Sequence, residues 1–228
     1  MRTSQRAARA LTRHVRQHSP ARLPPEILVS EEESLVYLVP SLLDSSEAAC
    51  LFAALESWEG FKRESDDFGP QQRLSAYFGD AGCTFSYVGL VCRPQPWLPC
   101  LDLVKRRVDS VIAAAHGTAC TGCLANNYEA DQGSIVWHGD EVRAHGSAKL
   151  VVSVSTGGAR PFMLRHRTTH RTLRMMLPPG SALVMAGETQ THWEHALPLE
   201  SPAPHRISLT FRSIVAGYEE EREPPHVP

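Results

Sequence analysis

Residues 134–141 read Ser-Ile-Val-Trp-His-Gly-Asp-Glu, a short apolar run followed by a histidine and, two positions later, by a carboxylate. The apolar run predicts a β-strand that presents His138 and Asp140 at its end. Much later in the chain comes His195, with His192 shortly before it. Two imidazoles and one carboxylate are the ligand set that holds non-haem Fe(II) and leaves positions open for small molecules. Because a lone His-x-Asp is often only a solvated turn, an iron site needs further support from the sequence.

That support lies at residues 206–212, Arg-Ile-Ser-Leu-Thr-Phe-Arg, soon after the second histidine. The segment is rich in strand-forming residues and carries an arginine at each end, Arg206 and Arg212. A planar guanidinium can bind a carboxylate through two parallel hydrogen bonds, and 2-oxoglutarate is a dicarboxylate. The iron ligands and the two arginines together favour an oxygenase that uses this keto acid as a co-substrate.

The composition is that of one intracellular globular domain. The chain has 228 residues, a formal charge of -2 and six cysteines. This length suits a single well-buried domain, and the charge neither favours nor excludes nucleic acid. No apolar run approaches the length of a membrane span, so we expect no membrane association. Scattered cysteines without a secretory segment indicate a reducing compartment, and the CxxC at Cys120 and Cys123 lacks the second pair that a zinc site needs.

Both ends of the chain differ in composition from the rest. Residues 1–25 contain six arginines and no acidic residue. Three interpretations stay open: a mitochondrial transit peptide, a basic arm for nucleic acid or nuclear import, and a solvated disordered tail. Residues 217–228 are acidic and proline-rich, which is typical of disorder. We therefore expect one domain at 26–216, located in the nucleus, with the mitochondrion as the alternative.

Two amphipathic helices and a hairpin are expected in the first half of the chain. Residues 44–47, Asp-Ser-Ser-Glu, have the form of a capping box, and apolar residues follow at helical spacing. A second helix begins around Pro99 and ends at Gly117. A hairpin is expected over residues 73–93, with its turn at 79–82, Gly-Asp-Ala-Gly.

The second half of the chain is dominated by strands. Glycine and proline interrupt its apolar segments at short intervals, which is typical of a compact β-sandwich or barrel with helices packed on the outside. We therefore expect an α+β domain that is mostly β. The expected strands cover residues 33–39, 124–128, 134–138, 149–155, 161–165, 172–177, 182–185 and 206–214.

Several motifs taken together resemble one known family. The motifs are Asn126-x-Tyr128, His138-x-Asp140, His195 and Arg206-x-Ser-x-Thr-x-Arg212. With the segments at 72–87 and 94–99, they are similar to the AlkB family of Fe(II)/2-oxoglutarate dioxygenases, most of all to the homologue 2 type of its DNA-repair branch. The resemblance spans residues 33–214. It implies a double-stranded β-helix, a cupin-like jelly roll, at 120–215, with flanking helices on one face and a nucleotide-recognition part at 60–93.

The resemblance also implies an activity. Fe(II), 2-oxoglutarate and O2 would oxidise an N-methyl group on a nucleic-acid base, and the product would break down to formaldehyde and a repaired base. His138, Asp140 and His195 would hold the iron. We prefer His195 to His192 because the residues that follow it, up to Pro198, match the family.

The co-substrate residues follow from the same resemblance. Arg206 and Arg212 would bind the carboxylates of 2-oxoglutarate. Hydrogen bonds would come from Asn126, Tyr128, Ser208 and Thr210. The family usually has asparagine where Ser208 stands, so this chain departs from the pattern at one co-substrate contact.

A base must leave its stack before an enzyme can act on its edge, and aromatic side chains then grip it. Phe85 and Tyr87 alternate on an expected strand and would be these walls, in reverse order relative to the related enzymes. Glu141, next to an iron ligand, could accept a hydrogen bond from an exocyclic amine. Arg73 lies in the nucleotide-recognition segment, and Phe68 is the candidate wedge that displaces the base.

A basic segment follows the iron motif. It contains Arg160, Arg165, His166, Arg167, His170, Arg171 and Arg174 and no acidic residue. On a hairpin, such a segment would form a cationic rib for phosphates, with Arg165 and Arg167 as the binding residues. A merely solvated charged face is the alternative.

The favoured function is therefore repair of alkylated DNA by a monomeric enzyme. An RNA demethylase of the same family is the nearest alternative. An oxygenase of a small molecule or protein would have no use for the basic rib or the paired aromatics. A binding module that has lost catalysis is disfavoured, because the ligands and arginines are all present.

Overall fold

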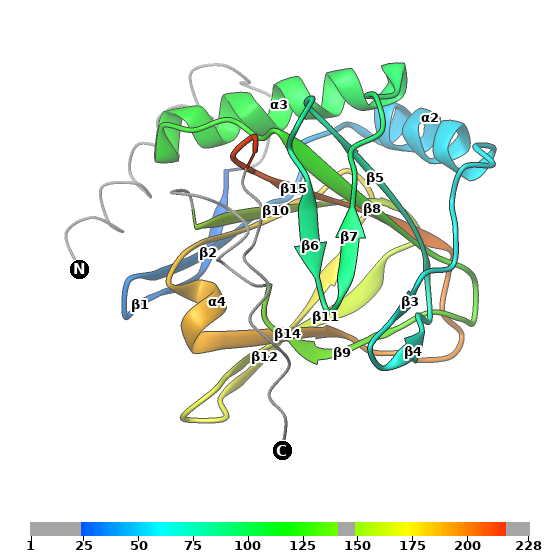
Figure 1. The fold of residues 1–228 in the computed structure, drawn as a ribbon. Coiled ribbons are helices and arrows are strands. Elements are labelled where there is room, and N and C mark those ends of the chain that lie inside the picture. The colour runs from blue at the N-terminus through cyan, green and yellow to red at the C-terminus, as the bar shows by residue number, and fades with distance from the viewer. Residues whose placement is uncertain (1–23, 141–148, 218–228) are drawn as a thin grey trace, which may run out of the picture.

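The computed structural model describes residues 24–140 and 149–217. Within them, the chain forms two facing antiparallel sheets with two long helices over the outer face of the larger one (Figure 1). This confirms the expected mostly β jelly roll with helices on one face. The larger sheet runs in the order β1 (Glu26–Glu31), β2 (Ser34–Val39), β13 (Ala182–Gly187), β10 (Leu150–Gly157), β15 (Arg206–Arg212), β8 (Gly122–Tyr128), β5 (Leu74–Gly79). The smaller sheet runs in the order β12 (Thr172–Leu177), β11 (Arg160–His166), β14 (Trp193–Leu197), β9 (Ile135–His138).

Strand β15 shows how one sequence serves both faces of the larger sheet. Successive side chains on a strand point to opposite faces. Ile207, Leu209 and Phe211 are fully buried against the helices. The intervening positions, from Arg206 to Arg212, face the smaller sheet and the space between the sheets. Apolar packing on one face thus fixes a row of polar groups on the other.

The two expected helices are confirmed. Helix α2 (Ser45–Glu56) begins with a full capping box, in which Asp44 and Glu47 each accept from the other's backbone N–H at 2.8 Å. Helix α3 (Pro99–His116) begins with proline at its first position and ends at Gly117, whose φ of 65° is left-handed. Arg107 on α3 pairs with Glu47, so the helices are joined by an ion pair as well as by apolar packing. Neither these helices nor the short α4 (Thr189–His192) is long and apolar enough to cross a membrane.

The expected hairpin over residues 73–93 is wrong. Strand β5 pairs with β8, residue Tyr77 opposite Leu124, rather than with the segment after the turn. That segment instead forms its own hairpin of β6 (Phe85–Tyr87) and β7 (Leu90–Cys92). Its turn is Val88-Gly89, both with positive φ, 43° and 76°. Such a two-residue turn matches the twist of the flanking strands, which favours it over the longer connection.

Four further strands, β1, β14 and the two strands of a small hairpin, are not expected from the sequence. Strand β14 carries Glu194 and His195 between apolar residues, and it becomes central in the smaller sheet through pairing with β11 and β9. The small hairpin joins β3 (Ser65–Asp66) to β4 (Gly69–Pro70) in the segment before β5. Cys120 and Cys123 are buried free thiols in the core beneath the helices.

Candidate active site

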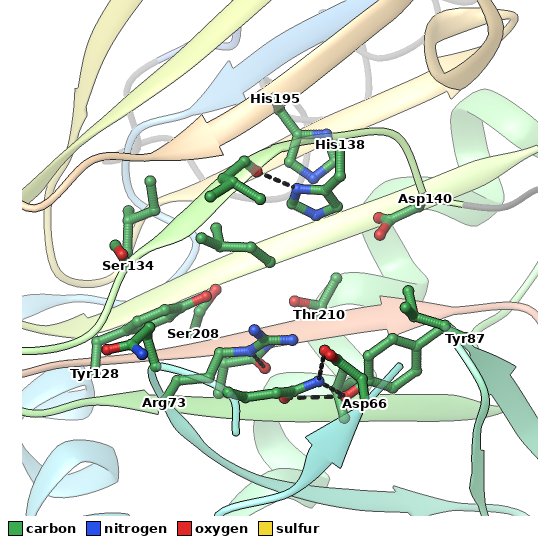
Figure 2. Close-up of a pocket in the computed structure, with 18 of the residues that line it drawn as sticks. Asp66, Arg73, Tyr87, Tyr128, Ser134, His138, Asp140, His195, Ser208 and Thr210 are labelled. Atoms are coloured by element: carbon green, nitrogen blue, oxygen red, sulfur yellow. Dashed lines mark hydrogen bonds between the residues drawn. The ribbon is translucent and has the colours of Figure 1, made fainter. Parts of the chain in front are cut away.

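One cavity of about 610 Å³ lies between the sheets. Both sheets and the two small hairpins contribute to its lining, which brings together residues that are far apart in sequence (Figure 2). The residues expected from the sequence that line it are Phe68, Arg73, Phe85, Tyr87, Asn126, Tyr128, His138, Asp140, His195, Arg206, Ser208, Thr210 and Arg212. Arg165 and Arg167 are not in the lining, and Glu141 lies outside the described residues.

Three of these residues could hold a metal ion. His138 ends β9 and pairs directly with His195 on β14, and their ring centroids are 4.2 Å apart. Asp140 follows two residues after His138. One potential ligand atom from each of the three lies within 4.8 Å of the others, and no second such group occurs among residues 24–140 and 149–217. Strand pairing therefore positions two ligands, and the chain continuing from β9 brings the third.

The protonation of both histidines suits metal binding. The Nδ1 atom of His138 lies 2.8 Å from the Val136 carbonyl oxygen, which can only accept, so Nδ1 carries the proton and Nε2 is left for a metal. Burial lowers the pKa of His195 to about 3, and the nearby His138 and Arg212 act in the same direction. His195 is thus neutral at physiological pH, as a metal ligand must be.

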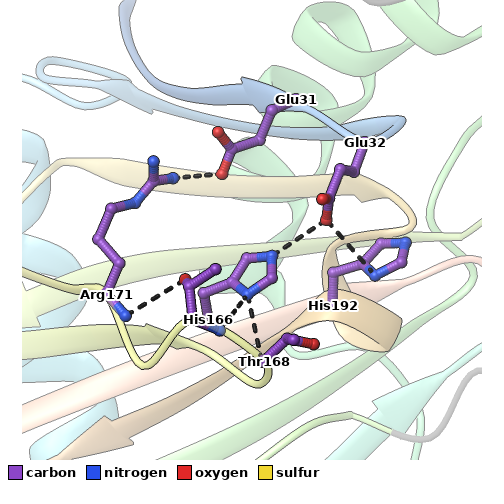
Figure 3. A network of polar contacts seen from close by, with 7 residues as sticks. Glu31, Glu32, His166, Thr168, Arg171 and His192 are labelled. Carbon is purple, nitrogen blue, oxygen red and sulfur yellow. Dashed lines mark hydrogen bonds and ion pairs between the residues drawn. The ribbon is translucent and has the colours of Figure 1, made fainter.

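His192 lies away from this group. It ends the short helix α4, where its Nδ1 is 3.8 Å from a carboxylate oxygen of Glu32 (Figure 3). Its ring stacks parallel to that of His166, which is itself 3.0 Å from Glu32. The same turn of β1–β2 supplies Glu31, which pairs with Arg171. These contacts place His192 in a surface network rather than at the cavity.

Arg206 is a buried cation that faces the cavity. Its guanidinium donates to the hydroxyls of Ser155 at 2.9 Å and Ser208 at 3.3 Å. Its buried Nε has no hydrogen-bond partner in the described part of the chain. Burial lowers the pKa of Arg206 to about 10, and the neighbouring Arg160 contributes to the lowering. A buried guanidinium that meets only hydroxyls and leaves a donor unused is suited to an anion from outside the chain.

Arg212 joins the possible metal site to the aromatic side of the cavity. Its Nη2 lies 3.0 Å from Oδ1 of Asp140, and its guanidinium carbon lies 4.6 Å from the Phe85 ring centroid. Its buried Nε also lacks a partner within the described residues. The two ends of β15 therefore present two guanidinium groups on the same face, each with capacity for one more acceptor.

The other expected co-substrate residues lie beside these arginines. In the sheet, Tyr128 is opposite Arg206 and Asn126 is opposite Ser208. The side-chain oxygen of Asn126 accepts a hydrogen bond from Nε of Arg73 at 2.7 Å, so the N–H2 group of Asn126 points away from Arg73. Ser208 Oγ is 3.0 Å from Ser153 Oγ on the next strand. These groups form one continuous polar floor. Its chemistry fits a dicarboxylate beside Fe(II), with a two-histidine, one-carboxylate ligand set.

An aromatic wall adjoins this floor at Arg212. The rings of Phe85 and Tyr87 are nearly parallel, with centroids 5.3 Å apart. The Tyr87 hydroxyl lies within 3.4 Å of the Gln71 amide, whose Nε2 donates to Asp66 at 3.0 Å. Asp66 and Gln71 line the cavity too. The sequence offered no signal for this pair, because both lie in a polar stretch without a motif.

Phe68 is 91% exposed at the tip of the β3–β4 hairpin, on the rim of the cavity. A hydrogen bond within the hairpin connects Phe68 to the cavity lining: Oδ1 of Asp66 accepts from the Phe68 backbone N–H at 2.9 Å. Among the large apolar side chains of residues 24–140 and 149–217, that of Phe68 is the most exposed, which makes it a candidate contact residue. The adjacent Asp67 lies against Gly89, where a Cβ atom would be 2.4 Å from its carboxylate. The two small hairpins thus touch at their tips.

The expected cationic rib is largely neutralised. Arg160 is fully buried and donates to the backbone oxygens of Gln132 and Gly133, so it does not belong to a surface. Arg165 and Arg167 share Glu194, at 2.5 and 3.8 Å. Two further arginines of this segment form ion pairs, Arg171 with Glu31 and Arg174 with Glu200. The acidic partners come from other parts of the chain, so the linear sequence does not reveal them: Glu194 lies on β14, Glu31 on β1 and Glu200 in the segment after β14.

Arg167 nevertheless lies at the metal-binding loop. A Cβ atom on Gly139 would be 2.6 Å from Arg167 Nη2 and 3.0 Å from the Gln190 carbonyl oxygen. Glycine at position 139 therefore allows this guanidinium to rest against the backbone between two possible ligands. Arg165 stacks its guanidinium on Trp137, 4.3 Å from the ring centroid.

Comparison with known proteins agrees with this geometry. Residues 36–212 match the family model described as the 2OG-Fe(II) oxygenase superfamily. The chain is similar to the DNA oxidative demethylase ALKBH2 of Mus musculus, with 37% identity over 63% of this chain and 62% of that protein. The human ALKBH2 is 35% identical over 63% of this chain and 57% of its own length. The alkB homolog 3 dioxygenase of Rattus norvegicus is 30% identical over 79% of this chain and 64% of that protein.

A solved structure supports the fold. The chain described as "The structure of OsALKBH1" superposes with a TM-score of 0.57 and 15% identity, covering 82% of this chain and all of that one. Since the ALKBH2 alignments cover 62% or less of the mouse and human relatives, the chain spans about three fifths of their length. The chain belongs to the 2OG-Fe(II) oxygenase superfamily, which uses Fe(II) and 2-oxoglutarate, and within it resembles the AlkB proteins.

Proposed function

We propose that this chain is an Fe(II)- and 2-oxoglutarate-dependent oxidative demethylase of N-alkylated bases in nucleic acid, and that it repairs DNA by direct reversal of alkylation. One observation carries the proposal. The His138–Asp140–His195 group, two arginines with unused donors and a stacked aromatic pair all open into the same cavity. A methyl group on a base held by the aromatic wall would therefore face the iron.

The residues divide the work as follows. With Fe(II), 2-oxoglutarate and O2 bound, the site supplies the oxidation that converts an N-methyl group to an unstable hydroxymethyl group, which leaves as formaldehyde. His138, Asp140 and His195 hold the iron, and the hydrogen bond from His138 to Val136 fixes its ring. The groups that bind and orient 2-oxoglutarate are Arg206, Arg212, Asn126, Tyr128, Ser208 and Thr210.

The proposed substrate residues lie next to the co-substrate residues, because Phe85 contacts Arg212 and Arg73 donates to Asn126. Phe85 and Tyr87 stack on the displaced base, and Arg73 lies beneath them, bonded to Asn126. Phe68 is the candidate wedge, supported by its exposure on the hairpin tip. Glu141 remains a proposed acceptor for the exocyclic amine on the strength of its position after Asp140.

Arg165 and Arg167 are proposed to bind the phosphates that flank the base. Glu194 balances one of their two charges, so the pair keeps a net positive charge beside the metal-binding loop. Residues 26–216 form the proposed catalytic domain of a monomer that acts in the nucleus, with the mitochondrion as the alternative location.

An RNA demethylase is a second candidate. The pairing of Arg171 and Arg174 with glutamates favours it, because few cations are then left to bind the second strand of a duplex. A single-stranded substrate, either DNA or RNA, needs only the pair beside the cavity.

The test is 2-oxoglutarate consumption in the presence of Fe(II) and oligonucleotides of one sequence. The set contains methylated and unmethylated single-stranded DNA, duplex DNA and RNA. The proposal expects consumption to rise only with the methylated strands, and the strand that gives the largest rise identifies the substrate. Consumption that none of the methylated strands raises would refute a nucleic-acid demethylase.

A further inference from the structure

One proposed metal ligand lies beyond the end of the strand that carries its neighbour. Strand β9 ends at His138, and Asp140 follows two residues later. The backbone N–H of Asp140 donates to Oε1 of Gln190 at 3.0 Å. Gln190 belongs to the short helix α4, 50 residues further along the chain. A side chain from a distant element therefore restrains the main chain at this ligand.

Gln190 is part of the packed interior. It is 9% exposed, and its Nε2 donates to Sδ of Met185 on β13 at 3.7 Å. This contact fits the orientation of the amide, because the reverse orientation would turn the N–H2 group toward the N–H of Asp140. The helix itself is anchored on β13 by Thr189, whose Oγ1 donates to the carbonyl of Ala186 at 2.6 Å. The acceptor that meets Asp140 is thus held on a fixed support.

The loop between the proposed ligands also packs directly on α4. A Cβ atom on Gly139 would lie 3.0 Å from the Gln190 carbonyl oxygen, which is closer than side-chain atoms normally approach a carbonyl. The same atom would lie 2.6 Å from Nη2 of Arg167. Gln190 therefore meets this loop twice, through a side-chain hydrogen bond to one residue and through close backbone contact with the residue before it.

We propose that Gln190 is a positioning residue for the metal: its side-chain oxygen holds the backbone of Asp140 so that the carboxylate faces His138 and His195, as Figure 2 shows. This inference rests on the metal ligands of the proposed function. Arg212 lies 3.0 Å from Oδ1 of Asp140, so the carboxylate has another partner to follow when the restraint is lost. Partners that orient a metal ligand typically change metal affinity by about ten- to a hundredfold.

The experiment measures the dissociation constant for Mn(II) in the absence of 2-oxoglutarate, from the electron paramagnetic resonance signal of the free ion. Mn(II) accepts nitrogen and oxygen ligands, as Fe(II) does. Gln190→Met keeps the length of the side chain and removes the acceptor, so the dissociation constant should rise about tenfold or more. Gln190→Glu keeps an oxygen acceptor at the same distance from the backbone and should restore most of the affinity.

Thr191→Ala is the matched control, because Thr191 is an exposed neighbour on the same helix and its hydroxyl donates to Glu188 at 2.9 Å. Its Mn(II) affinity should equal that of the wild type. Thermal unfolding of the metal-free variants, with midpoints equal to that of the wild type, separates positioning from folding. Gln190→Asn, whose amide is one methylene too short to reach Asp140, should lose affinity like Gln190→Met and serves if that variant does not fold.

Two results would overturn the role of Gln190. One is wild-type affinity in a folded Gln190→Met or Gln190→Asn protein. The other is an equal loss in Gln190→Met and Gln190→Glu, because the acceptor oxygen would then not be the cause. Either result leaves the proposed function standing. Wild-type protein whose Mn(II) affinity is unchanged by His195→Ala would instead overturn the proposed metal site, and this inference with it.

Discussion

At the scale of the residue, burial and one backbone hydrogen bond decide which histidines can bind iron. His195 is buried beside His138, whereas His192 is half-exposed beside Glu32. His195→Ala should therefore abolish Fe(II) binding and Fe(II)-dependent turnover, because losing one ligand of three leaves an incomplete site. His192→Ala should retain most of both. Iron content after anaerobic loading and gel filtration measures the difference, and inactivation by His192→Ala alone would show that the third ligand is misassigned.

Arg206 and Arg212 make a second prediction about single residues. Arg206→Lys and Arg212→Lys should each raise the 2-oxoglutarate concentration needed for half-maximal turnover, because lysine keeps the charge but cannot form a two-point fork. Arg174→Lys, on an exposed ion pair with Glu200, is the control and should leave that concentration unchanged. Co-substrate dependence that is the same in all three variants would rule out the two arginines as the anchor.

At the scale of the element, the β6–β7 hairpin couples the aromatic wall to the co-substrate side. Phe85 packs against Arg212, whereas Tyr87 contacts Gln71. Stacking is worth about 1–3 kcal/mol per base, so Phe85→Ala and Tyr87→Ala should each lower kcat/KM for a methylated oligonucleotide by roughly ten- to a hundredfold.

Only Phe85→Ala should also weaken 2-oxoglutarate binding, because it alone removes the ring beside Arg212. Titration of the iron-loaded variants with 2-oxoglutarate separates the two effects. If both ring deletions leave demethylation intact in folded protein, the rings belong to the core and do not bind the base.

Helix α2 gives a prediction about stability. Asp44→Ala removes the side-chain half of the capping box and should lower the free energy of unfolding by about 1 kcal/mol. Ser46→Ala, an exposed change in the same turn, is the control. Urea denaturation of both variants measures the difference, and an equal effect in both would mean that the cap contributes nothing.

The sequence predicted elements whose signals are local. The capping box at Asp44 and the left-handed Gly117 each act within one turn of a helix, so both helices were predicted. Strand pairing is not local. The sequence predicts a turn at residues 79–82, yet β5 pairs with β8, and Tyr77 and Phe78 are buried in that arrangement.

The candidate site shows the same division. The iron motif and the arginine strand could be recognised because their residue types are unusual in that order. Gln71 and Glu194 could not be recognised, because their contacts with Tyr87 and Arg165 arise only in the folded chain. The basic segment contains no acidic residue of its own. Pairing of β14 with β11 brings Glu194 next to Arg165 and neutralises part of the positive charge.

At the scale of the whole molecule, Arg165 and Arg167 keep a net positive charge beside the cavity, because they share the single carboxylate of Glu194. The logarithm of the affinity for nucleic acid falls linearly with the logarithm of the salt concentration. The slope is proportional to the number of phosphates that the protein neutralises. Arg167→Gln should therefore flatten the salt dependence of binding for all sequences alike. Arg171→Gln, whose partner is Glu31 in the network of Figure 3, should leave the slope unchanged. Fluorescence anisotropy at several salt concentrations checks this, and equal slopes for wild type and Arg167→Gln would remove Arg167 from the interface.

The most direct test of the account is the mass of a methylated oligonucleotide after incubation with the protein, Fe(II), 2-oxoglutarate and O2. The account predicts an oligonucleotide that has lost its methyl group, with formaldehyde formed in equal amount, and no change with His195→Ala protein. An oligonucleotide of unchanged mass, in a reaction that consumes 2-oxoglutarate, would contradict it.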